Sequence, residues 1–395
     1  MTIAYDPFSH EAMKDPHPIY ARLRKESPMY FIEKYNAWAI SRFQDVWDAS
    51  LAQDVTFTSG QTPGQILLGE PVPHTFMTMD APEHRQWRGL VRLEYTPEGV
   101  KAHMDRIRSV TKDILTPLLA KGAFDIYADL ANKVTTINAG YMLGLSKEDA
   151  IQCRQWIDGM LHREEGQVGG GSAINGQSFG ALYGFLAQFV ADLRAHPEKA
   201  LRHTKAYLEA EIDGRRLGDE EITFYLFSLL ITGSETTPIT VAGTIYNLAQ
   251  NPAQLAQVKA DNSLLKKAFL EQVRYDQPTN MLARKAAKDM EIGGAQIKAG
   301  QGLLFLYASA CRDEEEFENA DKFDINRAPG RELTFGHGGH KCLGVHLGTA
   351  MGTIILEEIF AAIESYEVIE DQCQRLYGEH LSGWGKVPIK ITLKK

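Results

Sequence analysis

Apolar residues along the chain follow a helical spacing over most of its length and a strand-like spacing near both ends. The first segment is a short helix that places Ile19 and Leu23 on one face. The apolar runs 29–32 and 37–40 come next and flank the polar segment 33–36. Two short runs separated in this way predict a β-hairpin.

The middle of the chain predicts helices and the last third predicts further strands. Between about residues 100 and 270 the apolar positions recur with a period near 3.6. Strand-like runs return at 290–292 and 303–306, and residues 388–393 alternate between isoleucine and lysine or threonine. The sequence shows neither a linker composition nor an internal repeat. We therefore predict a mainly α fold with small β-sheets, which belongs to the α+β class.

Two stretches lack a regular pattern. The stretch 56–79 is rich in glycine, proline and threonine and predicts a long loop. No lysine or arginine occurs between Asp54 and His84. The stretch 167–184 is rich in glycine and predicts a second, mobile loop between two helices.

Composition and charge narrow the possible classes of protein. The chain has 395 residues, of which 44% are hydrophobic and 24% charged, as in ordinary globular proteins. Its net charge of −9 argues against nucleic-acid binding. The four cysteines are scattered, which predicts a reducing compartment without a disulfide framework. The first twenty residues contain no signal sequence or membrane anchor. We expect a cytoplasmic, monomeric protein that binds neither membranes nor nucleic acid.

The segment 335–344 carries the strongest chemical signal, because Cys342 lies among glycines and histidines just before an apolar helix. Free backbone N–H groups and a helix N-terminus both stabilise a thiolate. Three interpretations are open. Cys342 could be a buried cysteine in a surface turn. A zinc site could use the four possible ligands His337, His340, Cys342 and His346. Alternatively, Cys342 could be the axial ligand of a haem iron.

The haem interpretation rests on a resemblance. Phe335-Gly336-His337-Gly338-Gly339-His340-Lys341-Cys342-Leu343-Gly344 matches each fixed position of the signature Phe-Gly-x-Gly-x-His-x-Cys-x-Gly. It therefore resembles the cytochrome P450 family, whose haem iron carries a cysteine thiolate. The resemblance implies that Phe335, Cys342 and Gly344 bind haem b, with Cys342 ligating its iron. It also implies the triangular fold of that family, in which residues 1–395 form a single domain.

A second motif lies in the long apolar helix predicted at 224–248. Pro238 has no N–H to donate to the carbonyl of Ser234, so a local distortion with a free carbonyl and room for water is expected. Glu235 is costly in an apolar helix unless it is paired or functional, although it could also face solvent. Residues 232–237 resemble the family's Ala/Gly-Gly-x-Asp/Glu-Thr-Thr, with threonine at the first position. That resemblance implies that Glu235 and Thr236 are catalytic and supply the protons that O2 cleavage needs.

Further residues match the family's motifs position by position. His84, Arg88, Arg284 and His340 would bind the two carboxylates of the haem. Glu271 and Arg274 match a structural ion pair near the haem. After the cysteine, the family commonly continues with Ala-Arg-x-Glu, whereas this chain has Gly348, Thr349, Ala350 and Met351. We predict that this difference affects the partner-facing surface and helix packing, and leaves haem ligation intact.

Together these motifs imply a monooxygenase that inserts one oxygen atom from O2 into a neutral hydrophobic substrate of the terpenoid, steroid or alkyl-aromatic type. Electrons would come from a separate ferredoxin and its NAD(P)H-dependent reductase. Two alternatives are non-oxygenating haem chemistry on the same fold and a haem-binding sensor without turnover. The residues expected to line the substrate pocket are Leu68, Phe76, Leu229, Thr232, Gly233, Met281 and Leu282.

Overall fold

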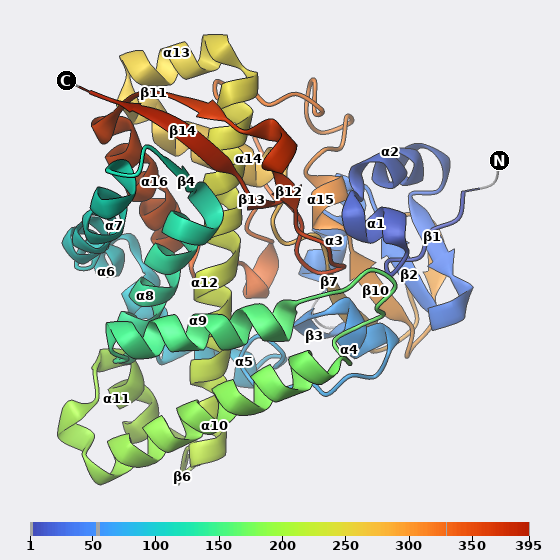
Figure 1. Cartoon of the computed structure of the whole chain (residues 1–395). Coiled ribbons are helices and arrows are strands. Elements are labelled where there is room, and N and C mark those ends of the chain that lie inside the picture. The colour runs from blue at the N-terminus through green and yellow to red at the C-terminus, as the bar shows by residue number, and fades with distance from the viewer. Residues whose placement is uncertain (1–2, 53–55, 329, 395) are drawn as a thin grey trace.

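A long central helix, α12 (Asp219–Gln250), organises the computed structural model of the chain, which describes residues 3–52, 56–328 and 330–394 (Figure 1). Most of its residues are buried on every side, as expected for a helix that is apolar all round. It packs against α8, α10, α14 and α16. Its first turn carries Asp219, Glu220 and Glu221, and acidic side chains stabilise the positive end of a helix.

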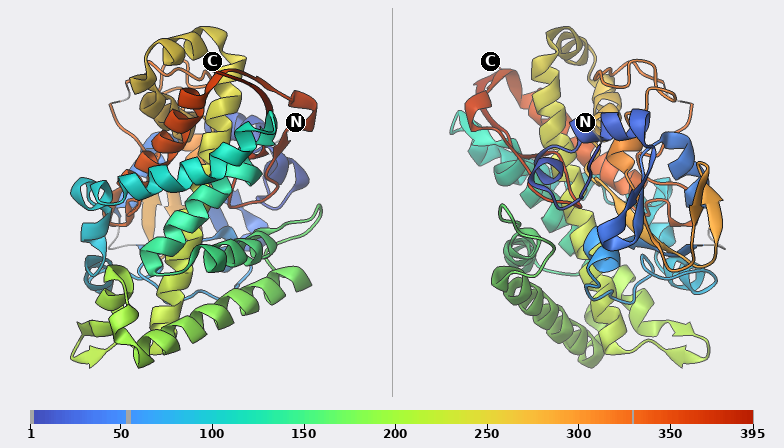
Figure 2. Two further views of the ribbon diagram at one scale, coloured as in Figure 1. Left: turned by 60° about the vertical axis from the view of Figure 1, so that its left-hand side comes forward. Right: turned by 90° about the vertical axis from the view of Figure 1, so that its right-hand side faces the viewer.

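Several other helices pack around α12, and α10 lies against it near one end (Figure 1 and Figure 2). The other α-helices are α1 (His10–Lys14), α2 (His17–Glu26), α3 (Phe43–Leu51), α4 (Pro63–Leu67), α5 (Glu83–Gly89), α6 (Pro97–Lys101), α7 (Met104–Leu119), α8 (Asn132–Leu143), α9 (Lys147–Leu161), α10 (Ala173–Ala195), α11 (Arg202–Glu209), α13 (Pro252–Ala260), α14 (Leu265–Tyr275), α15 (Tyr307–Ala310) and α16 (Val345–Ala362). Short helical turns are η1 (Glu33–Tyr35), η2 (Arg92–Tyr95), η3 (Ile126–Ala131), η4 (Pro197–Lys199), η5 (Asn262–Leu264), η6 (Gly338–His340) and η7 (Glu370–Gln372).

The strands form small sheets on opposite sides of α12 (Figure 1). The largest has five strands in the order β1-β2-β10-β7-β3, and a second has three in the order β11-β14-β4. The strands are β1 (Met29–Ile32), β2 (Ala37–Ile40), β3 (Thr56–Gln61), β4 (Ala123–Asp125), β5 (Glu211–Ile212), β6 (Arg215–Arg216), β7 (Leu282–Ala286), β8 (Met290–Ile292), β9 (Ala295–Ile297), β10 (Gly302–Phe305), β11 (Ile363–Val368), β12 (Gln374–Arg375), β13 (Trp384–Lys386) and β14 (Pro388–Leu393). The helix-rich fold with small sheets that the sequence predicts is confirmed.

The predicted hairpin is present as β1 and β2, which pair antiparallel with Met29 opposite Ile40. Strand β10 then joins β2 in parallel, with Gly302 opposite Ala37. The alternating C-terminal segment is strand β14, as predicted, and it pairs with β11. Local apolar patterns were therefore sufficient to predict these strands, because each one has a buried face.

The two stretches predicted as loops are partly regular, and those predictions are wrong in part. The stretch 56–79 contains β3 and α4, and the side chain of Thr62 caps α4 by accepting a hydrogen bond from the Gln65 N–H. The stretch 167–184 becomes helical at Ala173, where Ser172 and Asn175 form a capping box. Packing of α10 against α9 and α12 outweighs the low helix propensity of its glycines.

Helix α16 alone, within the described part of the chain, is long and apolar enough to cross a membrane. More than half of its apolar stretch is buried inside the protein, where it packs against α7, α12 and α14. This burial explains its composition as that of a core helix. A side chain on Gly352 would collide with the ring of Phe269 in α14, so this glycine permits the close packing of two helices.

Candidate functional site

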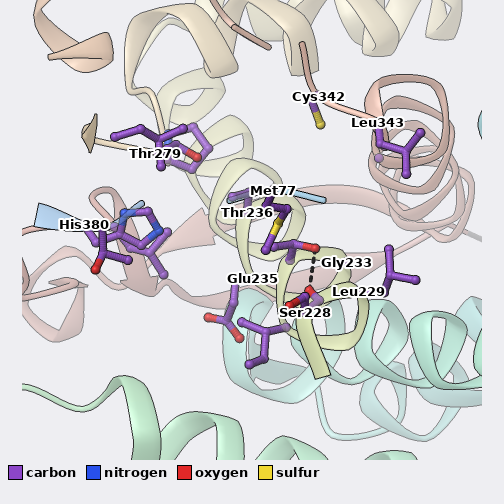
Figure 3. Close-up of a pocket in the computed structure, with 18 of the residues that line it drawn as sticks. Met77, Ser228, Leu229, Gly233, Glu235, Thr236, Thr279, Cys342, Leu343 and His380 are labelled. Atoms are coloured by element: carbon purple, nitrogen blue, oxygen red, sulfur yellow. Dashed lines mark hydrogen bonds between the residues drawn. The ribbon is translucent and has the colours of Figure 1, made fainter. Parts of the chain in front are cut away.

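A cavity of about 810 Å³ lies between α12 and the loop that precedes α16. Cys342 lies on one side of this pocket, and Thr236 and Glu235 come from α12 (Figure 3). Residues of the segment 73–78, of helix α8 and of 380–381 also line it. The pocket therefore brings together the two motifs that the sequence singled out more than a hundred residues apart.

The glycines of the cysteine loop allow the turn that presents Cys342 to the pocket. Gly336 and Gly338 have φ angles of +72° and +73°, which glycine adopts without strain. The backbone N–H of Cys342 donates to the carbonyl of Phe335 at 2.8 Å and closes the loop. The side chain of Cys342 borders the open pocket, and the protein encloses it on its other sides. This burial raises the pKa of the thiol, and the Gly344 N–H and Arg88 offset part of the increase.

The zinc interpretation is wrong for this loop. Among the described residues, no group of three or more histidine, cysteine or acidic side chains could hold a metal ion. His337 stacks on Trp47 with ring centroids 3.6 Å apart. His340 stacks on His84 at 3.9 Å. The candidate ligands therefore face different neighbours and do not converge on one point.

Two arginines and two histidines gather beside Cys342. His340, Arg88 and Arg284 line the pocket, and His84 lies behind His340. Burial lowers the pKa of His340 to about 3, with further lowering by His84 and the arginines. Burial and Arg88 lower the pKa of His84 to about 4. His84 Nε2 is buried without a hydrogen-bond partner. A ligand with carboxylate groups would stabilise the charged forms of these side chains and supply the missing partner.

Helix α12 continues through Pro238 without a break. The carbonyl that the proline leaves without a helical donor accepts a hydrogen bond from another residue. The hydroxyl of Thr135 in α8 lies 3.2 Å from the carbonyl of Ser234 and 3.0 Å from the carbonyl of Asn132, so its single proton is shared between these two acceptors. The expected free carbonyl with room for water is therefore not observed at this position. A buried carbonyl without a partner is costly, which explains why a neighbouring helix supplies the bond.

Glu235 is buried and forms an ion pair with Arg154 of α9. Arg154 also contacts the exposed carboxylate of Asp158 at 2.5 Å. Burial raises the pKa of Glu235, and Arg154 offsets part of that increase. For Arg154 burial acts in the lowering direction, but the carboxylates of Glu235 and Asp158 outweigh it and raise its pKa. The alternative that Glu235 faces solvent is wrong, and a chain of charges leads from it to the surface.

Two threonines of α12 lie on the pocket wall, one helical turn apart. The hydroxyl of Thr232 donates to the Ser228 carbonyl at 2.8 Å, so its proton is already used (Figure 3). The hydroxyl of Thr236 makes no such bond with any described residue and lines the pocket. Thr236 is therefore the one of the two whose hydroxyl is available to a bound molecule.

Most of the pocket wall is apolar. Five of the seven predicted pocket residues line it, namely Phe76, Leu229, Thr232, Gly233 and Leu282. The prediction is wrong for Leu68, which is exposed at the surface, and for Met281, which is fully buried in the cluster with Tyr20. Met281 directly precedes β7, where successive side chains alternate between faces, so it points away from the pocket that Leu282 lines.

Several residues at the pocket could not be predicted from sequence patterns. Arg163 lines it from the loop after α9 and contacts Glu379 at 3.3 Å. Glu70 accepts a hydrogen bond from the Gly170 N–H at 2.7 Å, which joins the segment after α4 to the same loop. His380 also lines the pocket. These residues come from distant segments, and only the folded chain brings them together.

Comparison with known proteins agrees with this site. The cytochrome P450 family model matches residues 178–391. The putative cytochrome P450 123 of Mycobacterium tuberculosis is 33% identical over 396 residues, covering 99% of this chain and 98% of that protein. The chain belongs to the cytochrome P450 family. Among solved structures, P450 CREJ in complex with (4-ethylphenyl) dihydrogen phosphate has 28% identity and a TM-score of 0.88, covering 99% of this chain and 100% of that one. A mutant of P450 EryK in complex with erythromycin B has 26% identity and a TM-score of 0.86, covering 96% and 97%.

This P450 is a haem-thiolate monooxygenase that binds haem b. The residues present fit that group, because a thiol, a buried His84 nitrogen without a hydrogen-bond partner, the guanidinium groups of Arg88 and Arg284 and the ring of His340 adjoin one pocket. Gly344 and Gly348 also line the pocket and leave its wall flat. Gly352 does not contribute to this flat face, because Phe269 covers it. When bound, the haem would supply the activation of O2 that a monooxygenase requires, with Cys342 as the residue that would hold its iron.

The predicted structural pair is present and fully buried in this P450. Arg274 binds Glu271 through two hydrogen bonds of 2.7 and 2.8 Å. The guanidinium of Arg274 also donates to the carbonyls of Cys311 and Ala320. The residues after the cysteine that differ from the family's pattern also pack within the fold, because Thr349 and Met351 are both buried in α16. These contacts hold the segment before the cysteine loop against the core.

Proposed function

We propose that this P450 hydroxylates a neutral, largely apolar molecule held between α12 and the haem. In this proposal Cys342 ligates the iron, Phe335 and Gly344 shape the loop around it, and the whole chain acts as one domain. The observation that carries the proposal is one apolar pocket with Cys342 on one side and Glu235 and Thr236 on another. In the same proposal, the haem is positioned by four side chains that bind its carboxylates: His84, Arg88, Arg284 and His340.

Glu235 and Thr236 are the proposed proton donors. The Thr236 hydroxyl is available at the pocket wall, and the buried Glu235 directly precedes it in the sequence. Burial raises the pKa of Glu235, which makes its carboxyl a better proton donor than an exposed glutamate, although Arg154 offsets part of this increase. Arg154 links this carboxyl to Asp158 at the surface. Movement of the Arg154 guanidinium between the two carboxylates would open a route for protons from solvent.

The charge of the pocket favours a neutral substrate of the terpenoid, steroid or alkyl-aromatic type. Two charged side chains of the substrate region are neutralised by ion pairs: Glu235 pairs with Arg154, and Arg163 pairs with Glu379. P450 CREJ holds an aryl phosphate in its solved structure. In this chain an anion would compete with Glu379 for Arg163 and would lie near Glu70. We therefore expect anionic ligands to bind more weakly than neutral ones.

The proposed electron donor is a ferredoxin reduced by an NAD(P)H-dependent reductase. Arg85, Arg92 and Lys341 are exposed on the elements around the cysteine loop. Arg88 ties the two parts of this surface together by donating to the Lys341 carbonyl at 2.5 Å. A basic surface within a protein of net charge −9 would guide an acidic partner towards the haem.

Ligand binding to the purified haem protein tests the proposed substrate class. Binding near the iron displaces water and shifts the haem absorption spectrum. We expect shifts with a terpenoid alcohol, a steroid or an alkylbenzene, and dissociation constants at least about tenfold weaker for the matching carboxylates. Tighter binding of a fatty acid or an alkylbenzoate would contradict a neutral substrate. Turnover of a bound ligand with NAD(P)H, reductase and ferredoxin tests the reaction itself.

A further inference from the structure

One end of the pocket carries two polar side chains, Thr279 and His380, in an otherwise mostly apolar lining. They lie on the same side of the pocket, across from Leu229 and Leu343 (Figure 3). Thr279 forms an isolated antiparallel bridge with Leu381, so the two segments run side by side. Neither residue belongs to the motifs that define the haem site.

The backbone around His380 is held firmly. The Asn280 N–H donates to the His380 carbonyl at 2.9 Å, and the Asn280 side chain donates to the Glu379 carbonyl at 2.8 Å. Asn280 is itself fixed, because its side-chain oxygen accepts a hydrogen bond from the Tyr20 hydroxyl at 3.0 Å. His380 is thus placed before any ligand arrives, which reduces the entropy lost on binding.

The hydrogen bond of the His380 ring defines its tautomer. Nδ1 lies 3.1 Å from the Met281 carbonyl, which can only accept, so Nδ1 carries the proton. Burial lowers the pKa of His380, and its charged neighbours Glu379 and Arg163 pair with each other. The ring is therefore neutral, and Nε2 is an unprotonated acceptor. Nε2 makes no hydrogen bond to the described residues, while the ring lines the pocket.

The Thr279 hydroxyl complements this acceptor. It lines the pocket and makes no hydrogen bond within the described part of the chain. A hydroxyl can donate or accept as its partner requires. A ligand hydroxyl placed here could donate to His380 Nε2 and accept from Thr279 Oγ1. A ketone or ether oxygen could use Thr279 alone and would leave Nε2 without a partner.

We propose that His380 and Thr279 bind a hydroxyl group of the substrate and so select alcohols or phenols among apolar molecules. This inference rests on the proposed function, because it requires that the substrate occupies this pocket. It makes His380 a specificity-determining residue, distinct from the proton donors of α12. A buried acceptor left unsatisfied by the wrong ligand opposes binding, so the hydroxyl should strengthen binding roughly tenfold.

Matched ligand pairs test the proposal on the haem-loaded protein. The pairs are para-hexylphenol with para-hexylanisole, and a hydroxysteroid with its methyl ether, each titrated by the spectral shift. We expect the wild type to bind the hydroxyl member of a pair roughly tenfold more tightly. His380→Phe should remove this preference and leave binding of the ethers unchanged. His380→Gln keeps an acceptor at this position and should retain most of the preference.

The outcomes separate this inference from the proposed function. Equal binding of the two members of each pair by the wild type would overturn the role of His380 while leaving a hydrophobic pocket. A preference that persists in His380→Phe would overturn it as well. Failure of every pair to bind would contradict the proposed substrate class. The tautomer of His380 would then be the remaining test of the proposed hydroxyl-binding role.

The tautomer is measured without any ligand. Nitrogen NMR of histidine-labelled protein, in the diamagnetic reduced CO complex, reports the protonation of each ring nitrogen. Comparison with His380→Gln assigns the His380 signals. We expect a neutral ring with its proton on Nδ1. A proton on Nε2 would make the nitrogen facing the pocket a donor, and the proposed selection of hydroxyl donors would be wrong.

Discussion

A buried carboxylate needs a compensating charge, and Arg154 supplies it to Glu235. Both side chains are largely buried, whereas Asp158, the other partner of Arg154, is exposed. Removing one member of a buried pair leaves the other charged and desolvated, which costs more than the pair contributes. The stability of the protein should therefore depend on Arg154 in a way that varies with pH.

Replacement of Arg154 by methionine should destabilise the protein by about 3–5 kcal/mol at neutral pH. Without Arg154, the already raised pKa of Glu235 should rise further, so the folded state holds its proton more tightly than the unfolded chain does. Stability should then fall as the pH rises from about 4.3, the pKa of an unfolded glutamate, through the folded pKa. Urea unfolding at several pH values measures this loss.

The double variant Arg154→Met with Glu235→Gln is the matched control. Its stability should show less pH dependence than that of Arg154→Met, because the buried titrating group is gone. An Arg154→Met variant as stable as the wild type at neutral pH would contradict the buried ion pair.

The hydroxyl of Thr236 is the second feature at this scale that a single substitution tests. Thr236→Ala should retain haem and ligand binding, but product formed per NAD(P)H should fall roughly tenfold or more as hydrogen peroxide takes its place. Thr232→Ala is the control, because the Thr232 hydroxyl is already bonded to the Ser228 carbonyl. Peroxide and product are quantified against NAD(P)H consumed. Unchanged coupling in Thr236→Ala would argue against its role as a proton donor.

At the scale of elements, α8 completes the backbone of α12. Thr135→Val should remove the donor to the Ser234 carbonyl and destabilise the protein by about 1–3 kcal/mol, because that carbonyl is buried and Pro238 offers no N–H. Thr136→Val is a matched control on the same helix. The Thr136 hydroxyl bonds only to the Asn132 carbonyl, which belongs to α8 itself. Equal loss of stability in the two variants, measured by urea unfolding, would contradict this account.

The contact between α14 and α16 depends on a glycine. Gly352→Ala should destabilise the protein by about 1–3 kcal/mol, because the added methyl group would overlap with atoms of the Phe269 ring. Among protein atoms, a methyl group in Gly348→Ala meets only the Thr237 hydroxyl, at 3.3 Å, so this variant should cost less folding stability. Thermal unfolding of both variants gives the comparison. A larger loss in Gly348→Ala would show that the packing is assigned to the wrong glycine.

Elements differ in how far the sequence predicts them. Pro238 correctly indicated a carbonyl without its helical donor, since that effect is local. The donor, Thr135, lies about a hundred residues earlier, and no local pattern connects the two. Similarly, the glycines of 167–184 suggested a loop, but contacts with α9 and α12 stabilise α10 there. Local chemistry was predictable from sequence, whereas its tertiary partners were not.

The same division holds for the pocket. Cys342, Arg88 and Arg284 could be identified because each lies at a fixed spacing within a short motif. Arg154 and His380 belong to no such motif, and their functional contacts are with residues far away in the chain. The proposed substrate selectivity therefore depends mainly on contacts that sequence patterns do not report.

On the scale of the whole molecule, the loop between α9 and α10 is tied to distant parts of the chain. Glu165 contacts His10 at 3.1 Å, and Arg163 contacts Glu379 at 3.3 Å. The Gly170 N–H donates to Glu70 at 2.7 Å. Because Arg163 and Gly170 also line the pocket, these polar contacts link the N-terminal and C-terminal parts of the fold to the substrate region.

The proposed oxygenation in this pocket depends on a haem that Cys342 holds at the pocket wall. The most direct test is the difference spectrum between the reduced protein with and without CO. We expect the strongly red-shifted Soret band of a thiolate-ligated haem in the wild type and in Cys373→Ser, and its loss in Cys342→Ser. A histidine-type band in the wild type, or a thiolate band that survives in Cys342→Ser, would contradict the central claim.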